Sequence, residues 1–268
     1  MGLLPSRCFV LRRALVPAVL AMLAAPGAGD AAAPAEDGRG TVVEVVDGDT
    51  VILDGGLQVR LVGIQAPKLP LDRPGFQKWP LADEAKAALA ALTKGRVVGL
   101  EYGGRRRDRH GRALAHLVTE DGRWVQGALL TQGMARVYSF RDNRARVPEM
   151  LALERAARAE RRGIWGHSYY RVRRATETPQ LIDSFQLVEG RVHRAAVVRG
   201  RLYLNFTEDW REDFTVTFSA RDRALLDREG FDYLGLEARR IRVRGWLKSW
   251  NGPMIEATHP EQIEVLGQ

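Results

Sequence analysis

Short runs of alternating hydrophobic and polar residues fill the first half of the chain, and such alternation is typical of β-strands. Two of these runs are TVVEVVDGDTVIL at 41–53 and LQVRLVGI at 57–64, separated by an Asp-Gly-Gly hairpin signal. Further strand-like runs are RVVGLEY at 96–102 and GRALAHLVTEDGRWV at 111–125. The segment 66–80 contains four prolines, which predicts an irregular loop.

Helical patterns separate and follow these strands. The run LADEAKAALAALTKG predicts a helix that ends at Gly95, and VQGALLTQG predicts a short helix at 125–133. The run VPEMLALERAARAERRGIW at 147–165 has apolar residues on one broad face, which predicts a longer helix. Strands followed by a few helices indicate a small barrel of mixed α+β class over residues 40–169.

The C-terminal part of the chain predicts a second domain that is richer in strands. The polar segment RVRRATETPQLIDS (171–184) indicates a linker, so we place the boundary at residues 170–184. Strand patterns then recur over residues 185–268, with one short helical run, RDRALLDREG. Such a region fits a small β-rich barrel of the OB type.

The N-terminus has the pattern of a secretory signal peptide over residues 1–33. Three arginines precede the apolar run ALVPAVLAMLAA, and small residues follow it. A short linker at 34–39 would then lead into the first domain. This reading predicts an exported protein, periplasmic or secreted, without an integral membrane segment once the signal is cleaved. An uncleaved anchor is the alternative. The single cysteine, Cys8, would be removed with the signal.

Composition adds a preference for anionic partners. Hydrophobic residues make up 45% and charged residues 28% of the chain, as in ordinary globular proteins, and the formal net charge is +8. A positive excess favours polyanions such as nucleic acid or anionic lipid. A basic proteome would give the same charge without such a partner, and the sequence leaves the oligomeric state open.

Five segments, taken in order, resemble the thermonuclease family, whose members are also called staphylococcal-nuclease-like, over roughly residues 40–169. They are VVDGDT with its strand pair, VRLVGI followed by AP, RDRHGRALAHL, DGRWVQGALLTQGMARV and a last helix that ends in RRGIW. The resemblance implies an OB-type five-stranded barrel with three helices. It also implies calcium-assisted cleavage of phosphodiester bonds in DNA or RNA.

The resemblance assigns roles to four charged residues. Asp49 matches a calcium ligand and Asp47 its outer-shell partner, and Arg60 and Arg112 match two arginines that clamp the phosphate. Carboxylate oxygens suit Ca²⁺, which neutralises charge on the phosphoryl group. Arginines can bind its oxygens in a bidentate manner.

Three other positions depart from the family pattern. Gln65 stands where a second aspartate ligand is expected, and Lys68 stands where a glutamate would act as general base. Ala66 replaces a threonine that contributes its backbone carbonyl. Two negative charges are thus replaced by one positive charge, so calcium binding in the family manner is doubtful. Lys68 could instead hold a phosphate directly, and Asp72 or Glu84 could rebuild a metal site.

Structural readings of the same residues stay open. Asp47 and Asp49 could be turn residues only. Arg60 lies opposite its apolar neighbours in the alternation and needs an anionic partner, for which Asp49 or Glu101 are candidates. The two histidines near this segment, His110 and His116, lack metal-ligand partners at useful spacing and are expected to be surface or structural residues.

Aromatic and basic residues interleave in the second domain. Rings on a small barrel can stack against the bases of a single-stranded nucleic acid. The alternative, which we favour from the sequence, is that most of these rings lie in the core. The residues are Tyr203, Phe206, Trp210, Phe214, Phe218, Trp246 and Trp250, among Arg199, Arg201, Arg211, Arg242 and Arg244.

Three hypotheses follow. The chain is an exported nuclease of endonuclease type with an altered metal and base site. Alternatively, it is an inactive relative that binds nucleic acid or another polyanion, or a module of the cell envelope that binds proteins. The sequence does not separate DNA from RNA, or endonuclease from exonuclease action.

Overall fold

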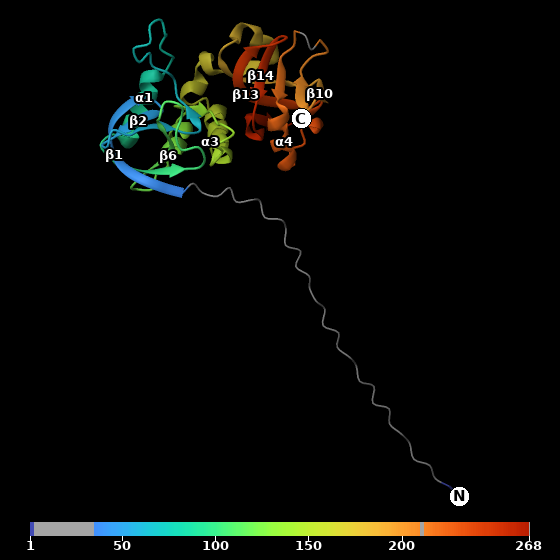
Figure 1. Ribbon diagram of the computed structural model, residues 1–268, viewed down its shortest axis with the longest axis horizontal. Helices are drawn as coiled ribbons and strands as arrows, with labels where there is room; N and C mark the ends of the chain where they lie inside the picture. The colour runs from blue at the N-terminus through green and yellow to red at the C-terminus, as the bar shows by residue number, and fades with distance from the viewer. Residues whose placement is uncertain (3–34, 210–211, 268) are drawn as a thin grey trace. The chain divides into compact units, whose positions relative to one another are not determined.

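The strand β1 (Ala35–Asp47) closes the first sheet because it pairs with two neighbours. Its end pairs with β2 (Thr50–Leu53) and its beginning with β5 (Val97–Tyr102). The strands β3 (Gln58–Leu61) and β6 (Ala113–Thr119) complete a closed barrel with the order β1-β2-β3-β6-β5. The pairing of β3 with β6 is parallel. Figure 1 shows this computed structural model, which describes residues 1–2, 35–209 and 212–267.

Three helices accompany the barrel, as the sequence predicted. They are α1 (Ala82–Thr93), α2 (Val125–Thr131) and α3 (Val147–Ala159), and a 3₁₀ turn, η1 (Gly163–Gly166), follows α3. Apolar residues from the strands and from all three helices form one buried cluster. The prediction of a five-stranded barrel with helices is therefore confirmed, and the proline-containing segment 66–80 is irregular.

Alternation along β3 decides which side chains face the site. Val59 and Leu61 are buried in the barrel core, whereas Gln58 and Arg60 are partly exposed. Successive side chains of a strand point to opposite faces. Arg60 is therefore directed away from the core, as the sequence alternation predicted.

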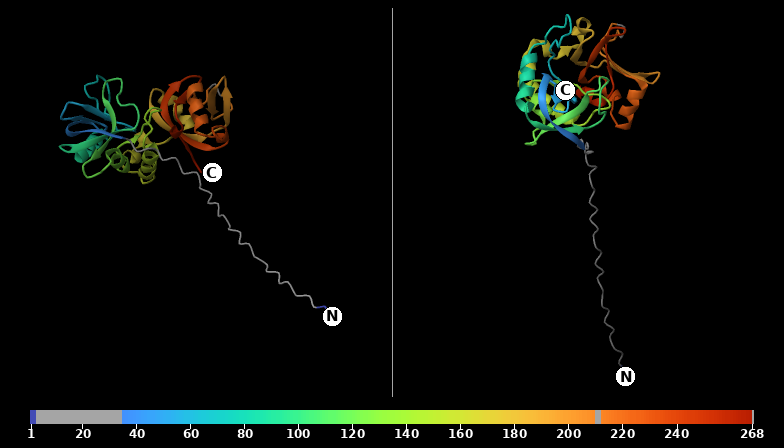
Figure 2. Two further views of the ribbon diagram at one scale, coloured as in Figure 1. Left: turned by 60° about the horizontal axis from the view of Figure 1, so that its bottom comes forward. Right: turned by 60° about the vertical axis from the view of Figure 1, so that its left-hand side comes forward.

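The second sheet belongs to the C-terminal part and is separate from the first (Figure 2). Its chain order is β9 (Phe185–Arg191), β10 (Arg194–Val198), β11 (Arg201–Asn205), β12 (Thr215–Phe218), β13 (Arg240–Ser249) and β14 (Pro253–Ala257). Neighbours in space follow the order β10-β11-β12-β14-β13-β9, with β8 (Arg173–Arg174) beside β9 and β15 (Ile263–Val265) beside β13.

The two sheets share one strand path. A parallel pair occurs in each, β3 with β6 and β12 with β14. In the chain, α1 lies between β3 and β6, and α4 (Ala220–Arg228) lies between β12 and β14. The strands β9 and β10 are nearly continuous in the chain but take the two positions at opposite sides of this path that β1 takes with its two ends. The further β-rich region therefore repeats the strand order of the first barrel.

Two segments expected to be linkers carry regular structure. Residues 35–39 form the beginning of β1, because strand pairing uses backbone groups and tolerates polar side chains. The segment 171–184 contains β8 and the 3₁₀ helix η3 (Ala175–Leu181), within which Thr178 is buried. The division into two domains stays a prediction. The predicted signal peptide, apart from its first two residues, and residue 34 lie outside the described residues.

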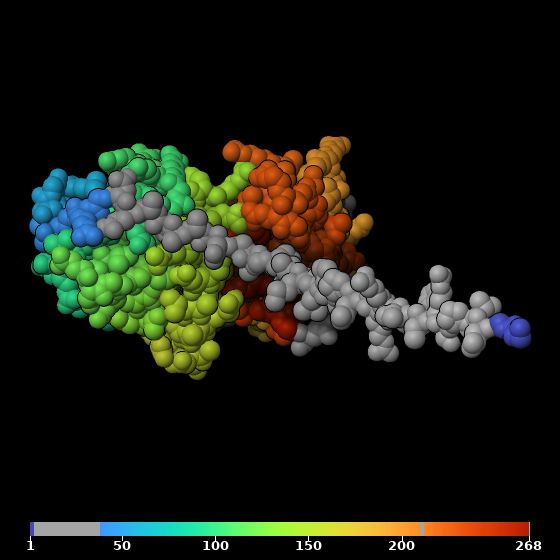
Figure 3. All heavy atoms as spheres, turned by 90° about the horizontal axis from the view of Figure 1, so that it is seen from below, coloured from blue at the N-terminus to red at the C-terminus, as the bar shows by residue number. Residues whose placement is uncertain are grey.

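A buried ion cluster joins α3 to the second sheet. Arg244 of β13 donates to Glu154 of α3 at 2.9 and 3.0 Å and to Glu264 of β15 at 2.5 Å. Arg158 of α3 also contacts both glutamates, at 3.0 and 3.1 Å. In Figure 3 the yellow-green surface around α3 adjoins the red C-terminal surface. Residues 32–268 form one compact unit.

Candidate functional site

A tight turn between β1 and β2 places two aspartates side by side. Asp47 accepts a hydrogen bond from the backbone N–H of Asp49 at 3.1 Å, and both carboxylates are buried. Gly48 stands between them because a side chain would collide with its neighbours. A Cβ atom there would lie 2.6 Å from that of Ala66 and 2.8 Å from that of Ala85. The sequence DGD is thus required by close packing as well as by its charges.

Lys68 supplies the cation that neutralises Asp49. Its ammonium nitrogen lies 2.7 Å from both carboxylate oxygens of Asp49 and 3.4 Å from Oδ2 of Asp47. The backbone N–H of Ala66 donates to Oδ2 of Asp49 at 2.7 Å. Ala66 therefore contacts this carboxylate through its amide. The proline-containing segment folds back over the aspartate turn and brings Lys68 with it.

Arg60 lies on the other side of the same carboxylate. Its Nη1 atom is 3.3 Å from Oδ1 of Asp49 and donates to the carbonyl oxygen of Leu61 at 2.6 Å. Its Nη2 atom donates to the carbonyl oxygen of Ile64 at 2.6 Å. Of the two partners considered from the sequence, Asp49 is the one used, because Glu101 accepts from Arg146 instead. These bonds fix the guanidinium plane beside the aspartate turn.

The two cations determine the protonation state of Asp49. The carboxylate is completely buried, and burial alone would raise its pKa. The positive charges of Arg60 and Lys68 and the hydrogen bonds from Lys68 and Ala66 outweigh burial, and the pKa falls to about 2. Asp49 is therefore an anion at neutral pH, enclosed by donors of the chain itself.

The side chain of Gln65 contacts Arg136 rather than the aspartate turn. It belongs to β4 (Ile64–Gln65), which pairs with β7 (Arg136–Val137). Its Oε1 atom accepts from Nε and Nη2 of Arg136 at 2.9 and 2.7 Å. Burial lowers the pKa of Arg136 to about 10, so this side chain stays charged at neutral pH. The amide oxygen of Gln65 thus serves a buried arginine that the sequence did not single out.

Arg112 directly precedes β6, the strand that pairs with β3, and lines the same pocket as Arg60. In the β3–β6 register Arg60 stands beside Leu114, and Arg112 precedes Leu114 by two residues on the same face. Both arginines line one pocket of about 480 Å³. Arg112 donates from Nε to Asp108 at 2.7 Å, and the backbone N–H groups of His110 and Arg112 also donate to Asp108.

The pocket is rich in positive charge. Four arginines and two aspartates line it, so arginines outnumber carboxylates by two. Two aromatic side chains, Tyr138 and Phe140, form part of its wall, with their ring centroids 4.8 Å apart at an angle of 89°. Phe140 is 47% exposed, which is unusual for a phenylalanine. The charged lining consists of Arg60, Arg105, Arg109, Arg112, Asp108 and Asp142.

Sequence reasoning missed several of these residues. Asp108 lies in the basic run 105–112, which gives no sign that one acid there holds Arg112. Tyr138 and Phe140 stand two residues apart beyond β7, and this spacing is the only sequence signal that they share a face. The sequence correctly predicted structural or surface roles for the two histidines. His116 is buried and accepts from the indole N–H of Trp124 at 3.2 Å, and His110 is exposed at the rim of the pocket.

The residues at the aspartate turn do not fit a calcium ion. Within residues 1–2, 35–209 and 212–267, no group of three or more His, Cys, Asp or Glu side chains is placed to hold a metal. The Lys68 ammonium occupies the face of Asp49 that a ligand would need, and Gln65 is engaged by Arg136. Asp72 and Glu84 are exposed and contribute nothing to the cluster. The possibility that one of these acids rebuilds a metal site therefore has no support in the structure.

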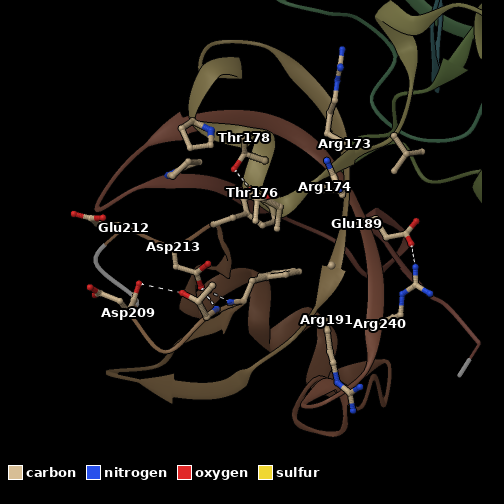
Figure 4. Close-up of a pocket in the computed structure, with 18 residues that line it drawn as sticks. Arg173, Arg174, Thr176, Thr178, Glu189, Arg191, Asp209, Glu212, Asp213 and Arg240 are labelled. Atoms are coloured by element: carbon tan, nitrogen blue, oxygen red, sulfur yellow. Dashed lines mark hydrogen bonds and ion pairs between the residues drawn. The ribbon is translucent and has the colours of Figure 1, made fainter.

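A pocket of about 940 Å³ lies elsewhere, in the second sheet. Figure 4 shows that its charged groups do not converge on one point. Arg240 is paired with Glu189, and Asp213 accepts from the backbone N–H groups of Phe206 and Thr207. Arg191 points away from the middle of the pocket. Because these charged groups do not converge, we do not place the site there.

Comparison with known proteins agrees with the first barrel. The family described as staphylococcal nuclease homologue matches residues 58–167. The chain is 36% identical to Protein ParB of Escherichia coli over 47% of this chain and 72% of that protein. It is 32% identical to an uncharacterized endonuclease of Escherichia coli O157:H7, over 48% of this chain and 78% of that protein.

A further relative is the thermonuclease of Staphylococcus hyicus, which is 29% identical over 47% of this chain and 75% of its own length. The family match includes Arg60, Lys68 and Arg112 and begins after Asp49, and each relative leaves about half of this chain unmatched. From the matched barrel and its strand order, the chain belongs to the staphylococcal nuclease homologue family.

Proposed function

We propose that this protein binds the phosphodiester backbone of nucleic acid in the arginine-lined pocket, without calcium at Asp49. The observation that carries the proposal is that Arg60 of β3 and Arg112, which directly precedes β6, line the same pocket. A phosphodiester is an anion with two non-bridging oxygens. Guanidinium groups on two sides can bind these oxygens through paired hydrogen bonds.

The ion pairs of the pocket support this role because they hold the arginines in place. Asp108 anchors Arg112 through Nε, and Asp49 with two carbonyl oxygens anchors Arg60. An anchored guanidinium loses less conformational freedom on binding than a free one. The excess of two positive charges over the lining carboxylates then favours an anionic ligand.

The aromatic wall supports a nucleic acid rather than a free phosphate. Tyr138 and Phe140 offer ring faces beside the arginines, and Phe140 is half exposed. Bases or sugars next to a bound phosphate can pack against such rings. DNA and RNA would both satisfy these contacts.

Lys68 takes the electrostatic place of a metal in this proposal. Its ammonium neutralises Asp49 and adds positive charge behind Arg60. Its position matches the expected general base, but a protonated amine held by two carboxylates has no free lone pair for water. For this reason we propose binding of nucleic acid as the first candidate function and cleavage as the second.

Hydrolysis is the second candidate function. It is favoured by relatives that are named endonucleases or thermonuclease and that share this barrel. The arginine pair would stabilise the charge that develops on the phosphoryl oxygens. The two altered positions, Gln65 and Lys68, argue for slow cleavage or none. A purely protein-binding module, the third hypothesis, would leave the arginine pocket without a role.

A binding titration tests the proposal. A fluorescein-labelled oligonucleotide should bind the wild-type chain equally well in EDTA and in calcium, and affinity should fall steeply with salt. The double variant Arg60→Ala/Arg112→Ala should bind at least tenfold more weakly, while Arg155→Ala on the exposed side of α3 should not. Equal binding by wild type and the double variant would refute the pocket. A gel assay of the same probe reports cleavage.

Export belongs to the proposal as well. It rests on the charged, apolar and small-residue order of residues 1–33, which predicts a periplasmic or secreted protein. Within the described part of the chain, no helix is both long and apolar enough to cross a membrane. Cell fractionation followed by mass measurement of the exported chain would reveal cleavage between residues 28 and 34. A full-length chain retained in the cytoplasm would contradict this part.

A further inference from the structure

The outer face of the second sheet carries polar and aromatic residues in register across several strands. Leu202 and Leu204 of β11 point into the core, so Tyr203 and Asn205 point outward. The register places Tyr203 beside Ala196 and Thr217. Outward residues from four strands and the β13–β14 turn line a pocket of about 570 Å³, among them Arg194, Tyr203, Asn205, Thr215, Met254 and Trp250. We call this surface the outer face.

Two tryptophans lie exposed on or beside the outer face. Trp250, at the end of β13, is 70% exposed, and Trp246 of the same strand is 43% exposed. Of the other aromatics singled out from the sequence, Phe214 and Phe218 are buried, whereas Tyr203 and Phe206 are partly exposed, so the favoured reading that most of these rings lie in the core holds only in part. Trp210 lies outside the described residues. The exposed indoles therefore need an explanation that the core cannot give.

Positively charged side chains from three strands, β10, β11 and β13, lie on the outer face. Lys248 of β13 pairs with Glu256 of β14 at 3.0 Å, and Arg201 of β11 contacts the same glutamate at 3.2 Å. Arg194 of β10 is exposed at the pocket. With Glu208, these groups make three cations and two carboxylates, a modest positive excess that suits an anionic chain.

The outer face continues to the arginine-lined pocket of the first barrel. The indole N–H of Trp246 donates to the hydroxyl of Tyr138 at 2.8 Å. Tyr138 packs edge-on against Phe140, and both line the pocket that contains Arg60 and Arg112. Trp246 thus connects the wall of the proposed phosphate site to β13, and Trp250 follows at the end of that strand.

We propose that the outer face binds the part of a single-stranded nucleic acid that extends beyond the arginine-lined pocket, with bases stacked on Trp250 and neighbouring rings. The inference rests on the proposed function. A single strand is required because its unpaired bases offer faces for stacking, whereas a duplex hides them. The backbone would pass near Lys248, Arg201 and Arg194. The second sheet then extends the substrate site and selects unpaired strands.

Probes of two lengths separate this inference from the proposed function. Anisotropy is measured in EDTA at low salt with a thymidine dinucleotide and with an oligothymidine of about 20 nucleotides, which is longer than the roughly 4 to 16 nucleotides that one OB fold binds. For Trp250→Ala we expect about tenfold weaker binding of the long probe and unchanged binding of the dinucleotide. Trp250→Phe should retain most of the affinity because it keeps a ring. Leu234 in η4 (Leu234–Leu236) is an apolar residue that is 52% exposed, so Leu234→Ala is the control and should change the binding of neither probe.

Each outcome decides one of the two proposals. Unchanged long-probe binding by Trp250→Ala and by the charge reversal Arg194→Glu would overturn the inference and leave the pocket intact. Unchanged dinucleotide binding by Arg60→Ala/Arg112→Ala would overturn the proposed function instead. A duplex of the same length that binds as tightly as the single strand, with the same loss in Trp250→Ala, would overturn the preference for single strands. Circular dichroism confirms that each variant is folded.

Discussion

The ammonium group of Lys68 lies 2.7 Å from both oxygens of Asp49, a carboxylate that is completely buried. The loss of either partner of a buried ion pair is strongly destabilising, because the other would remain as an uncompensated charge in a medium of low dielectric constant. Arg60 and the N–H of Ala66 complete the shell. The aspartate turn is therefore a closed salt-bridge cluster, in which the fixed cation beside Asp49 is the ammonium group of Lys68.

Removing the ammonium should destabilise the protein. In Lys68→Met, Asp49 keeps Arg60 but loses its shortest contacts, and we expect a loss of about 2 to 3 kcal/mol in the free energy of unfolding at pH 7. Lys78→Met is the matched control, since Lys78 forms an exposed pair with Asp83. Urea unfolding monitored by circular dichroism measures both variants. An equal stability of Lys68→Met and wild type would mean that the pair has no net effect.

The same cluster predicts a pH dependence at the acid end. The pKa of Asp49 in the folded protein is about 2, below the unfolded value of about 3.9. Its contribution is therefore present above pH 4 and is lost as pH falls toward 2. Asp49→Asn should accordingly cost about 2 kcal/mol at pH 7, and the difference from wild type should shrink below pH 4. A difference that stays constant from pH 7 to pH 2 would contradict the lowered pKa.

Two buried histidines predict a second loss of stability at less acidic pH. Burial, together with the smaller effect of nearby arginines, lowers the pKa of His116 to about 4 and that of His259 to about 3. The unfolded chain binds protons below its histidine pKa of about 6.5, whereas these folded side chains stay neutral. Stability should fall as pH drops from 6.5 to 4, by the order of 2 kcal/mol for each histidine.

His259→Asn tests this dependence because the imidazole of His259 forms a hydrogen bond of 2.7 Å with the hydroxyl of Ser139, which lies 120 residues away in the chain. The variant should be less stable at pH 7 but should lose less stability between pH 6.5 and pH 4. His193→Asn, an exposed histidine, serves as control. Parallel stability curves for His259→Asn and wild type would count against a neutral buried histidine.

Arg244 links the second sheet to the wall of the arginine-lined pocket. It donates to the carbonyl oxygen of Val137 at 3.3 Å and to Glu154, which itself accepts from the N–H of Val137 at 2.6 Å. Arg244→Met should cost about 3 to 5 kcal/mol, because it leaves buried carboxylates short of a partner. Adding Glu154→Gln should recover part of that loss by removing one of the charges. If the double variant is less stable than Arg244→Met, the loss does not come from unpaired charge.

The sequence predicted the barrel and its helices, because these depend on local periodicity. It assigned Arg60 and Arg112 to one site only through the family resemblance, and both line the same pocket. The partner of Gln65 could not be predicted. Arg136 lies 71 residues away, and only the pairing of β4 with β7 brings the two together. The aromatic continuation through Trp246 was hidden for the same reason, since Tyr138 is 108 residues away. Hydrophobic periodicity predicts local elements, and it does not predict which residues of distant segments come into contact.

The alteration of charges at Gln65 and Lys68 makes a repair experiment possible. Lys68→Glu removes the internal cation and leaves three carboxylates together at the turn. Without calcium the variant should be less stable than wild type, and calcium should raise its melting temperature while leaving that of wild type unchanged. Gln65→Asp alone should have a smaller effect, because Arg136 lies within 2.9 Å and would pair with the new carboxylate.

The double variant Gln65→Asp/Lys68→Glu should therefore gain calcium-dependent cleavage of a labelled oligonucleotide, with Lys68→Glu as the larger of the two steps. Metal and base act on the same water, so the gain in the double variant should exceed the product of the single gains. Adding Arg112→Ala should abolish cleavage but not the calcium-dependent rise in melting temperature, because Arg112 contacts Asp108 rather than the aspartate turn. Strong calcium-dependent cleavage by wild type that survives Asp49→Ala would place the working site elsewhere in the molecule.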